Sequence, residues 1–193
     1  MQHRFYALIS RMRYIGRWGL MKNTFHENIQ EHSHMVAVLA HGLALIQRDI
    51  LGEPADPDRC ASAALFHDAS EILTGDLPTP IKYYDPNIRD AYKKVEELGC
   101  RKLLSMLPEE FYEDYQALLE PAPDSYEHML IKAADKLAAF IKCVEELRSG
   151  NREFAKAAQA LRGELDAYLC HDEVRYFCDT YLESFTLTLD ELD

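Results

Sequence analysis

Helical spacing of apolar residues along almost the whole chain is the feature that most restricts its fold. In one long stretch, Val36, Leu39, Leu43 and Ile46 recur every three or four positions and so form a single stripe. No long alternation of apolar and polar residues indicates a sheet, and no segment is repeated. The chain has 193 residues, a length typical of one domain. We therefore expect an all-α fold, a helical bundle in which residues 1–193 form a single domain.

Capping and turn residues divide this pattern into helices. Asp56-Pro57 is typical of an N-cap followed by a proline at the first helical position, and this helix is expected to continue to Leu73 and end at Gly75. The run Leu77–Pro80 is expected to be non-helical, because each proline disfavours helical backbone in the residue before it. The alternation in Phe185–Leu189 predicts either a short strand or an extended tail. Another helix is expected to begin near Phe5. The remaining expected helices cover residues 29–51, 88–107, 109–119, 125–148, 152–169 and 172–183.

The charge balance narrows the partners that the chain can bind. It has 33 acidic residues against 21 lysines and arginines, which gives a net charge of −12 and a pI near 5.1. Such a chain does not favour polymeric nucleic acid or an anionic membrane surface. We expect no membrane span, because no apolar run approaches about 20 residues, and no signal peptide at residues 1–5. An anionic substrate must then be held by something other than bulk charge.

The cysteines indicate a reducing compartment. There are five of them, an odd number, and no two form a C-x-x-C pair. This usage argues against a disulfide framework and against a thiolate zinc site. We therefore expect free thiols in a cytoplasmic protein.

A polar triplet in an apolar segment is the first candidate for chemistry. His67, Asp68 and Glu71 lie in the otherwise apolar run from Ala63 to Leu73, at spacings that put them on one face of a helix. Burying an imidazole and two carboxylates is costly unless they pair with each other or bind a metal ion. A solvated helix face explains the same pattern, so the triplet alone leaves both interpretations open.

Two further residues are polar where a core residue is expected. Asp135 lies among small apolar residues in the middle of an expected helix, where aspartate is a poor helix former. The alternative for it is a surface pair with Lys132 or Lys136. His32 stands at the head of the apolar stripe, and the alternative there is a hydrogen-bonded core histidine. His34 points in a different direction on the same helix and is not expected to be a ligand.

Together, four of these residues indicate a metal site, since they come from three expected helices and all point to the interior. They are His32, His67, Asp68 and Asp135. Two neutral imidazoles and two carboxylates balance a divalent cation, and these nitrogen and oxygen ligands suit Mn²⁺, Co²⁺, Fe²⁺, Zn²⁺ or Mg²⁺. Such an ion activates water and holds a phosphoryl oxygen, so the metal rather than the net charge attracts an anion. Glu71 is then available as an acid or base beside the metal.

The same dipeptide occurs a second time, at His171-Asp172, and serves as a control. The flanking residues are strongly polar, and Asp172 is expected to be the N-cap of a helix. We expect this copy to be exposed to solvent and to take no part in the site.

The order of histidine, His-Asp and aspartate along a helical chain resembles the HD-domain phosphohydrolases. Longer runs make the chain similar to the bacterial 5′-deoxynucleotidases over most of its length, residues 84–124 excepted. The most specific run is Thr74-Gly75-Asp76-Leu77-Pro78-Thr79-Pro80-Ile81-Lys82. The others are Arg17-Trp18-x-Leu20-Met21, Glu27-Asn28-x-x-Glu31-His32-Ser33, His67-Asp68-Ala69-Ser70-Glu71, Lys132-Ala133-Ala134-Asp135 and Lys142-Cys143-x-Glu145-Glu146-Leu147.

The resemblance implies an HD-type bundle, a homodimer, and a role for each matched residue. Glu71 and Asp76 would be catalytic residues close to the attacking water and the leaving group. Arg17, Trp18 and Asp76 would bind the substrate and favour a sugar that lacks the 2′-hydroxyl. The ligands of one divalent metal ion, such as Co²⁺ or Mn²⁺, would be His32, His67, Asp68 and Asp135.

For two of these residues the sequence alone allows another explanation. Trp18 is the only tryptophan and lies in a glycine-flanked loop, so it could simply fill space between helices. Arg17 could equally be a surface arginine.

The residues and the resemblance together predict a metal-dependent phosphomonoesterase. It would hydrolyse a deoxyribonucleoside 5′-monophosphate to a deoxyribonucleoside and phosphate. One alternative is another HD hydrolase acting on a nucleoside triphosphate, an alarmone or a cyclic dinucleotide, although extra phosphates call for more cationic residues than this neighbourhood has. The other alternative is a regulator that binds a metal or a nucleotide without turnover.

Overall fold

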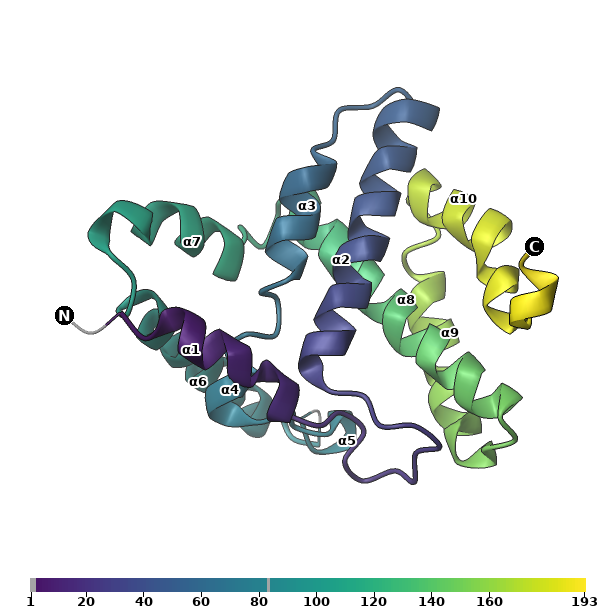
Figure 1. Cartoon of the computed structure of the whole chain (residues 1–193), viewed down its shortest axis with the longest axis horizontal. Helices are drawn as coiled ribbons and strands as arrows, with labels where there is room; N and C mark the ends of the chain where they lie inside the picture. Colours follow the sequence, from purple (N-terminus) through teal and green to yellow (C-terminus); the bar gives the residue numbers. More distant parts are fainter. Residues whose placement is uncertain (1–2, 83) are drawn as a thin grey trace.

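Two long helices, α2 (Ile29–Leu45) and α8 (Tyr126–Arg148), lie against each other at the centre of the molecule (Figure 1). A capping box begins α2, in which Asn28 and Glu31 each accept a hydrogen bond from the other's backbone N–H. The Ser125 hydroxyl caps α8 by accepting from the backbone of its first turn. Local side-chain chemistry therefore sets where both central helices begin.

The computed structural model describes residues 3–82 and 84–193, and the remaining helices surround the central pair. Short 3-10 or π-helical segments adjoin several of them, at residues 10–14, 46–50, 109–111, 152–154, 182–186 and 189–191. In chain order the helices are α1 (Phe5–Ile9), α3 (Pro57–Ala64), α4 (Glu71–Thr74), α5 (Thr79–Lys82), α6 (Pro86–Leu104), α7 (Tyr112–Leu119), α9 (Ala155–Asp166) and α10 (Asp172–Tyr181).

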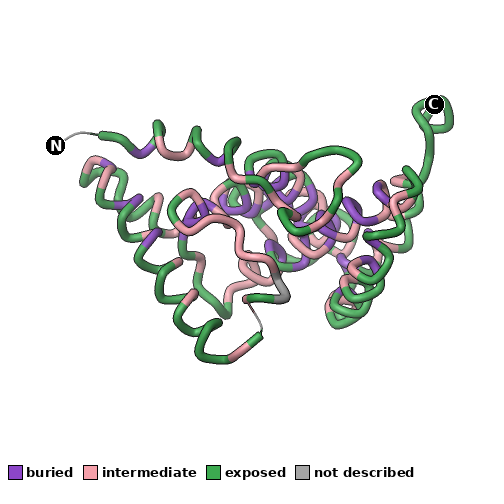
Figure 2. Tube along the Cα trace, turned by 90° about the horizontal axis from the view of Figure 1, so that it is seen from below, coloured by how far each residue is buried: buried purple, intermediate pink, exposed green. Residues whose placement is uncertain are grey.

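The main core lies where α2, α3 and α8 meet. The predicted stripe of α2 is fully buried there, with Val36 and Leu43 both at 0% exposure, and Leu130 and Leu137 of α8 pack against it. Buried residues are concentrated along these central helices and become rare toward the chain ends (Figure 2). This burial removes apolar surface from water and holds the central helices together.

A second, smaller core joins the N-terminal helix to α6 and α7. Phe5 of α1 packs with Leu103 and Leu104 of α6, and Tyr115 of α7 adds an edge-on ring contact with Phe5 at 4.8 Å between centroids. Ala69, at 0% exposure, belongs to this cluster although it follows α3. The segment after α3 is therefore held between the two cores.

The all-α prediction is confirmed, and most expected helices are found within a few residues of their predicted bounds. The helix expected from residue 29 to 51 is present but ends in a π-helical turn at Ile46–Ile50. The strand considered for Phe185–Leu189 is wrong, because residues 182–186 and 189–191 form 3-10 turns. The five cysteines are free thiols, as expected.

The continuous helix predicted from Pro57 to Leu73 is also wrong. Helix α3 ends at Ala64, and turns follow until α4 begins at Glu71. In these turns backbone N–H groups bond to the carbonyl three residues earlier, as from His67 to Ala64 at 3.3 Å. The chain turns so that Ala69 enters the second core and Ser70 lies against Gly99 of α6, where an added Cβ would meet Ser70 at 3.2 Å. Tertiary packing thus overrides the helical propensity of this segment.

The expectation that Leu77–Pro80 is non-helical is only partly met. Helix α5 begins at Thr79 and includes Pro80 in its first turn. Proline is tolerated there because the first N–H groups of a helix have no intrahelical partner. The end of α4 at Gly75 is confirmed, and Gly75 has the positive φ of 75° that favours glycine.

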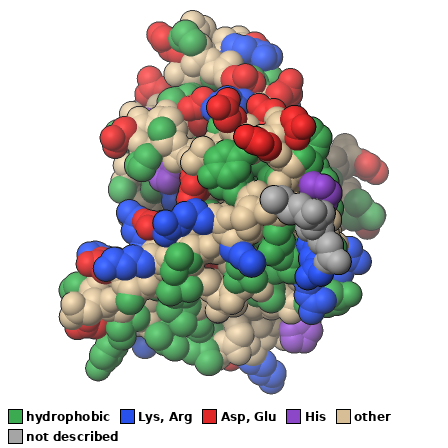
Figure 3. All heavy atoms as spheres, turned by 90° about the vertical axis from the view of Figure 1, so that its left-hand side faces the viewer, with side chains coloured by type: hydrophobic (Ala, Val, Ile, Leu, Met, Phe, Trp, Pro, Cys, Tyr) green, Lys and Arg blue, Asp and Glu red, His purple; other side chains and the backbone are tan. Residues whose placement is uncertain are grey.

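The surface carries charges of both signs together with exposed apolar side chains. On the face formed by the left-hand side of Figure 1, acidic side chains gather in the upper part and hydrophobic ones in the lower part (Figure 3). Tyr6 of α1 and Leu98 of α6 are 59% and 58% exposed. Within residues 3–82 and 84–193, no helix combines the length and the apolar character needed to cross a bilayer.

Candidate metal centre and active site

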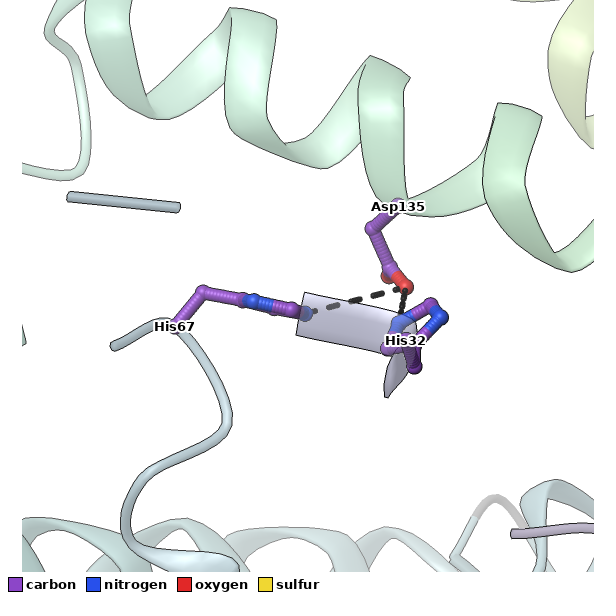
Figure 4. A group of neighbouring side chains, drawn as sticks. All are labelled: His32, His67 and Asp135. Atoms are coloured by element: carbon purple, nitrogen blue, oxygen red, sulfur yellow. Dashed lines mark hydrogen bonds and ion pairs between the residues drawn. The ribbon is translucent and has the colours of Figure 1, made fainter. Parts of the chain in front are cut away.

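Three side chains from separate elements converge at the centre of the bundle. His32 comes from α2, His67 from the turn after α3, and Asp135 from the middle of α8 (Figure 4). The Nε2 atom of His32 lies 3.0 Å from Oδ1 of Asp135, and Nε2 of His67 lies 4.0 Å from the same oxygen. One ligand atom from each residue lies within 4.8 Å of the other two. A single ion can therefore be reached by all three.

The hydrogen bonding of His67 prepares it as a metal ligand. Its Nδ1 lies 2.7 Å from the carbonyl oxygen of Ala64, and because a carbonyl only accepts, Nδ1 carries the proton. The Nε2 atom of the neutral ring then has a lone pair, and among the described residues its buried neighbours are carboxylate oxygens, which offer no proton to it. A ligating histidine commonly donates its other ring N–H to a backbone carbonyl. A lone pair that faces carboxylate oxygens is repelled by them unless a cation lies between, so this arrangement fits a bound cation.

Asp68 lies beside these three residues. Its Oδ2 is 3.1 Å from Nε2 of His67 and 3.7 Å from Nε2 of His32. The structure thus brings together all four residues predicted as ligands, although His67 and Asp68 lie in a turn rather than on a helix face. The alternative of a solvated helix face is wrong for His67, whose side chain is only 6% exposed.

The charges of this cluster suit a cation. Burial alone would lower the pKa of His67, but without a cation the Asp68 carboxylate raises it, so the ring tends to take up a second proton. Burial alone would raise the pKa of the Asp68 carboxyl, but the protonated His67 ring and then His32 hold it well below its usual range. The pKa of Asp135 is likewise lowered against the effect of burial, by the His32 hydrogen bond and by both imidazoles. Both carboxylates therefore remain ionised and supply negative charge beside two rings. The alternative of a surface pair for Asp135 is wrong, because its partner is His32.

Glu71 begins α4 and is almost buried, at 7% exposure. Burial, followed by repulsion from Asp68 and Asp76, raises its pKa to about 9. One of its oxygens, Oε2, is buried and has no hydrogen bond within the described structure. Perturbed carboxyl groups of this kind occur at sites of proton transfer.

Asp76 follows the left-handed Gly75 and faces the same region. Burial is the largest of the effects that raise its pKa, with Asp68 adding to it. The carbonyl of Gly75 accepts a hydrogen bond from the Tyr92 hydroxyl at 2.8 Å, which ties this turn to α6. No local sequence pattern singles out Tyr92, because its contact depends on how α6 packs.

Arg17 and Trp18 lie together beside the cluster. They line a cavity of about 620 Å³ with Asp76 and with apolar residues that include Leu161 of α9. The side chain of Arg17 is 13% exposed, and its Nη1 atom donates to Oδ2 of Asp68 at 3.4 Å. Burial alone would lower the pKa of Arg17, but the carboxylates of Asp68, Asp135 and Glu27 raise it above its usual value. The guanidinium therefore stays charged. The alternative of a surface arginine is wrong.

The Trp18 indole does fill space between elements, because its ring packs against Phe154 with centroids 5.3 Å apart. It also lines the cavity, so packing and substrate contact are compatible. Sequence reasoning assigned no role to Glu27, which accepts hydrogen bonds from both Arg17 and Trp18. The one sequence signal for Glu27 is that it begins the run Glu27–Ser33, which resembles the bacterial 5′-deoxynucleotidases.

Two further histidines of α2 lie outside this cluster. His34 is exposed, as expected, and His41 faces Asp58 at 3.7 Å. In the control dipeptide the expected cap is wrong by one residue, since His171 is the N-cap and Asp172 is the first residue of α10. The Asp172 carboxylate is exposed and pairs with Arg175, which stabilises the first turn without a side-chain cap.

Comparison with known proteins agrees with this arrangement. A family model described as 5′-deoxynucleotidase YfbR-like matches residues 4–185. The chain is 49% identical to a 5′-deoxynucleotidase of Photobacterium profundum and 47% identical to one of Vibrio parahaemolyticus, with 97% of each chain covered.

Two solved structures share the fold. An HD-domain phosphohydrolase of Listeria innocua matches with a TM-score of 0.83 at 24% identity, covering 95% of this chain and 88% of that one. A cyanophage S-2L HD phosphohydrolase, described as bound to dA and one catalytic Zn²⁺ ion, matches with a TM-score of 0.67 at 22% identity, covering 95% and 99%. The chain belongs to the YfbR-like 5′-deoxynucleotidase family.

Proposed function

We propose that this protein is a metal-dependent 5′-deoxynucleotidase, which hydrolyses a deoxyribonucleoside 5′-monophosphate to a deoxyribonucleoside and phosphate. Its likeness to 5′-deoxynucleotidases over 97% of the chain carries the proposal. The buried His/Asp cluster supports it, because that cluster lies next to a cavity lined by the cationic Arg17. An anion can therefore be bound despite the net charge of −12.

One divalent ion is proposed to bind at the cluster. The proposed ligands are His32, His67, Asp68 and Asp135, two neutral imidazoles and two ionised carboxylates. This mixture of nitrogen and oxygen ligands suits Co²⁺, Mn²⁺ or Zn²⁺, and one structural relative is described with zinc. A divalent ion held there supplies Lewis-acid activation of water and of the phosphoryl group.

The chain's own residues are proposed to bind the phosphate and move the protons. Arg17 presents its planar guanidinium to a phosphoryl oxygen, with charge-assisted hydrogen bonds. Glu71 has a buried oxygen that meets no hydrogen-bond partner within residues 3–82 and 84–193, and it lies near the Asp68 carboxylate, so its position suits proton exchange with the attacking water. Asp76 lines the cavity and is placed to protonate the leaving 5′-oxygen.

The proposal also covers the domain organisation, the oligomeric state and the compartment of the enzyme. Residues 1–193 are proposed to act as a single HD-type domain and to form a homodimer, as the resemblance implies. The five free cysteines support a reducing, cytoplasmic setting.

Phosphate release from a panel of nucleotides tests the function. With Co²⁺, Mn²⁺ or Zn²⁺ added, deoxyribonucleoside 5′-monophosphates are expected to yield equal amounts of nucleoside and phosphate, and a chelator is expected to stop the reaction. Hydrolysis of triphosphates or cyclic dinucleotides but not of monophosphates would indicate another HD hydrolase. Nucleotide binding without turnover under any metal would indicate a regulator.

Trp18 is expected to set the preference for deoxyribose. A stiff indole that fills the space of the 2′-hydroxyl leaves that hydroxyl buried and unpaired, which costs about 1–3 kcal/mol. Trp18→Ala should therefore reduce the ratio of kcat/KM for deoxyribo- over ribonucleotide by roughly ten- to a hundred-fold. Arg17→Ala should weaken both sugars alike, because phosphate is common to them. An equal ratio of kcat/KM for the two sugars in Trp18→Ala and wild type would show that Trp18 only packs against its neighbours.

A further inference from the structure

The backbone at Trp18 is in a conformation that a tryptophan rarely adopts. Its φ is +58°, the only positive φ of a non-glycine residue within residues 3–82 and 84–193. A bulky side chain in the left-handed region is unfavourable, and it persists where the surroundings hold it in place. Something in the structure must therefore fix this residue.

Glu27 is the residue that contacts both Trp18 and its neighbour. One of its oxygens, Oε2, accepts from the Trp18 indole Nε1 at 3.0 Å and from Arg17 Nε at 3.2 Å. The backbones are also paired, since the Arg17 N–H donates to the Glu27 carbonyl at 2.9 Å. The Glu27 side chain is only 14% exposed, so water does not readily replace it.

The parts of Arg17 and Trp18 that Glu27 does not hold face the candidate active site. With Nε held by Glu27, the Nη1 atom of Arg17 lies 3.4 Å from Oδ2 of Asp68. With its N–H held by Glu27 and its ring packed on Phe154, the Trp18 indole forms a wall of the cavity. A single carboxylate thus fixes a phosphate-facing group and a sugar-facing group relative to each other.

The part of the loop that precedes Glu27 is fastened to α8 by a buried ion pair. Lys142 and Glu146 are 2% and 0% exposed, and their charged atoms lie 2.5 Å apart. Glu146 accepts from the Thr24 backbone and hydroxyl, while the Lys142 ammonium donates to the Phe25 carbonyl at 2.8 Å. Although burial raises the pKa of Glu146, its hydrogen bonds lower it to about 2, so this carboxylate stays ionised. Glu27 therefore projects from an anchored segment.

We propose that Glu27 is a positioning residue that sets the orientation of Arg17 and Trp18, and through Trp18 determines the selectivity for deoxyribose. This inference rests on the proposed 5′-deoxynucleotidase function. Glu27 does not touch the reacting atoms in this mechanism, and its effect passes through the two side chains that it holds.

The sugar ratio in a double-mutant cycle tests this inference. In the wild-type background, Glu27→Ala is expected to lower the ratio of kcat/KM for deoxyribo- over ribonucleotide by on the order of ten-fold. In a Trp18→Ala background the same change should leave the ratio unaltered, because the residue through which it acts is gone. Glu27→Gln keeps an oxygen that can accept from the indole, so it should retain more of the ratio while raising KM for both sugars.

A second measurement needs no turnover. Trp18 is the only tryptophan, so emission excited at the long-wavelength edge, where the tyrosines do not absorb, reports on this indole alone. Glu27→Ala is expected to shift the emission as the indole N–H loses its partner. The matched control is Glu31→Ala, which removes a nearby carboxylate that accepts from the Asn28 backbone in the α2 capping box, and it should leave both emission and sugar ratio unchanged.

The outcomes separate the two proposals. If the wild-type protein hydrolysed no nucleoside monophosphate, the proposed function would be refuted. The emission shift would then still show whether Glu27 contacts the Trp18 indole. A wild type that prefers deoxyribose, with a Glu27→Ala variant of unchanged ratio, would overturn the role of Glu27. So would a Glu31→Ala variant that loses the ratio as strongly as Glu27→Ala, because the effect would then come from general loosening of the loop.

Discussion

Replacing Asp135 by alanine is expected to abolish both phosphate release and metal binding while the helices remain folded. Asp135 joins His32 and His67 at the point where one ion can be reached by all three. Removing it leaves two rings and one carboxylate, with less negative charge to attract a divalent cation. His32 also loses its partner at 3.0 Å, which is expected to lower the free energy of unfolding by about 1–3 kcal/mol.

Elemental analysis of the purified variant measures the bound metal, and circular dichroism measures the retained helix. His67→Ala and Asp68→Ala should behave in the same way. The matched control is Asp172→Ala, which changes the second His-Asp dipeptide and should leave turnover and metal content as in the wild type. A fully active Asp135→Ala enzyme, or an Asp172→Ala enzyme that lost its metal, would refute the site as described.

Replacing Glu71 by alanine is expected to slow turnover by on the order of 10–100-fold or more while metal and nucleotide still bind. Glu71 is nearly buried, and its pKa is raised to about 9 by burial and by two neighbouring carboxylates. One of its oxygens has no hydrogen bond in the part of the chain that the structure describes. Its loss removes a proton acceptor or donor without removing a proposed ligand. The effect should therefore fall on kcat more than on KM.

Glu71→Gln is the conservative partner of this change, because it keeps the shape of the side chain and removes its acid–base chemistry. Comparable losses of kcat in both variants would support proton transfer by Glu71. Loss of the metal in Glu71→Ala would instead make Glu71 a ligand, and that result would require a different ligand set.

Much of the fold was predictable because its signals are local. The stripe of α2, the Asp56-Pro57 start of α3 and the glycine stop at Gly75 each depend on residues within one or two turns. Such signals act in the same way in most contexts, so the expected helices were found close to their predicted bounds. The candidate ligands were also visible, since a charged residue in an apolar helical segment is costly without a partner.

The segment between α3 and α4 was not predictable in this way. Its sequence favours a continuous helix, yet the chain turns after Ala64 so that Ala69 enters the core beside α1 and α6. The energy of that packing comes from residues far along the chain, which no local pattern contains. The same turn brings the Nδ1 atom of His67 onto the Ala64 carbonyl and leaves Nε2 facing Asp135.

Local sequence patterns were sufficient for the fold class, for most of the helices and for the set of polar residues that had to find partners in the interior. Which atoms of those residues meet depends on contacts between distant segments. The bond from Trp18 to Glu27 is the clearest case, because it closes a loop that a buried ion pair on α8 holds in place. Periodicity places a residue on a face of its own helix, whereas the partner that it meets depends on how separate elements pack.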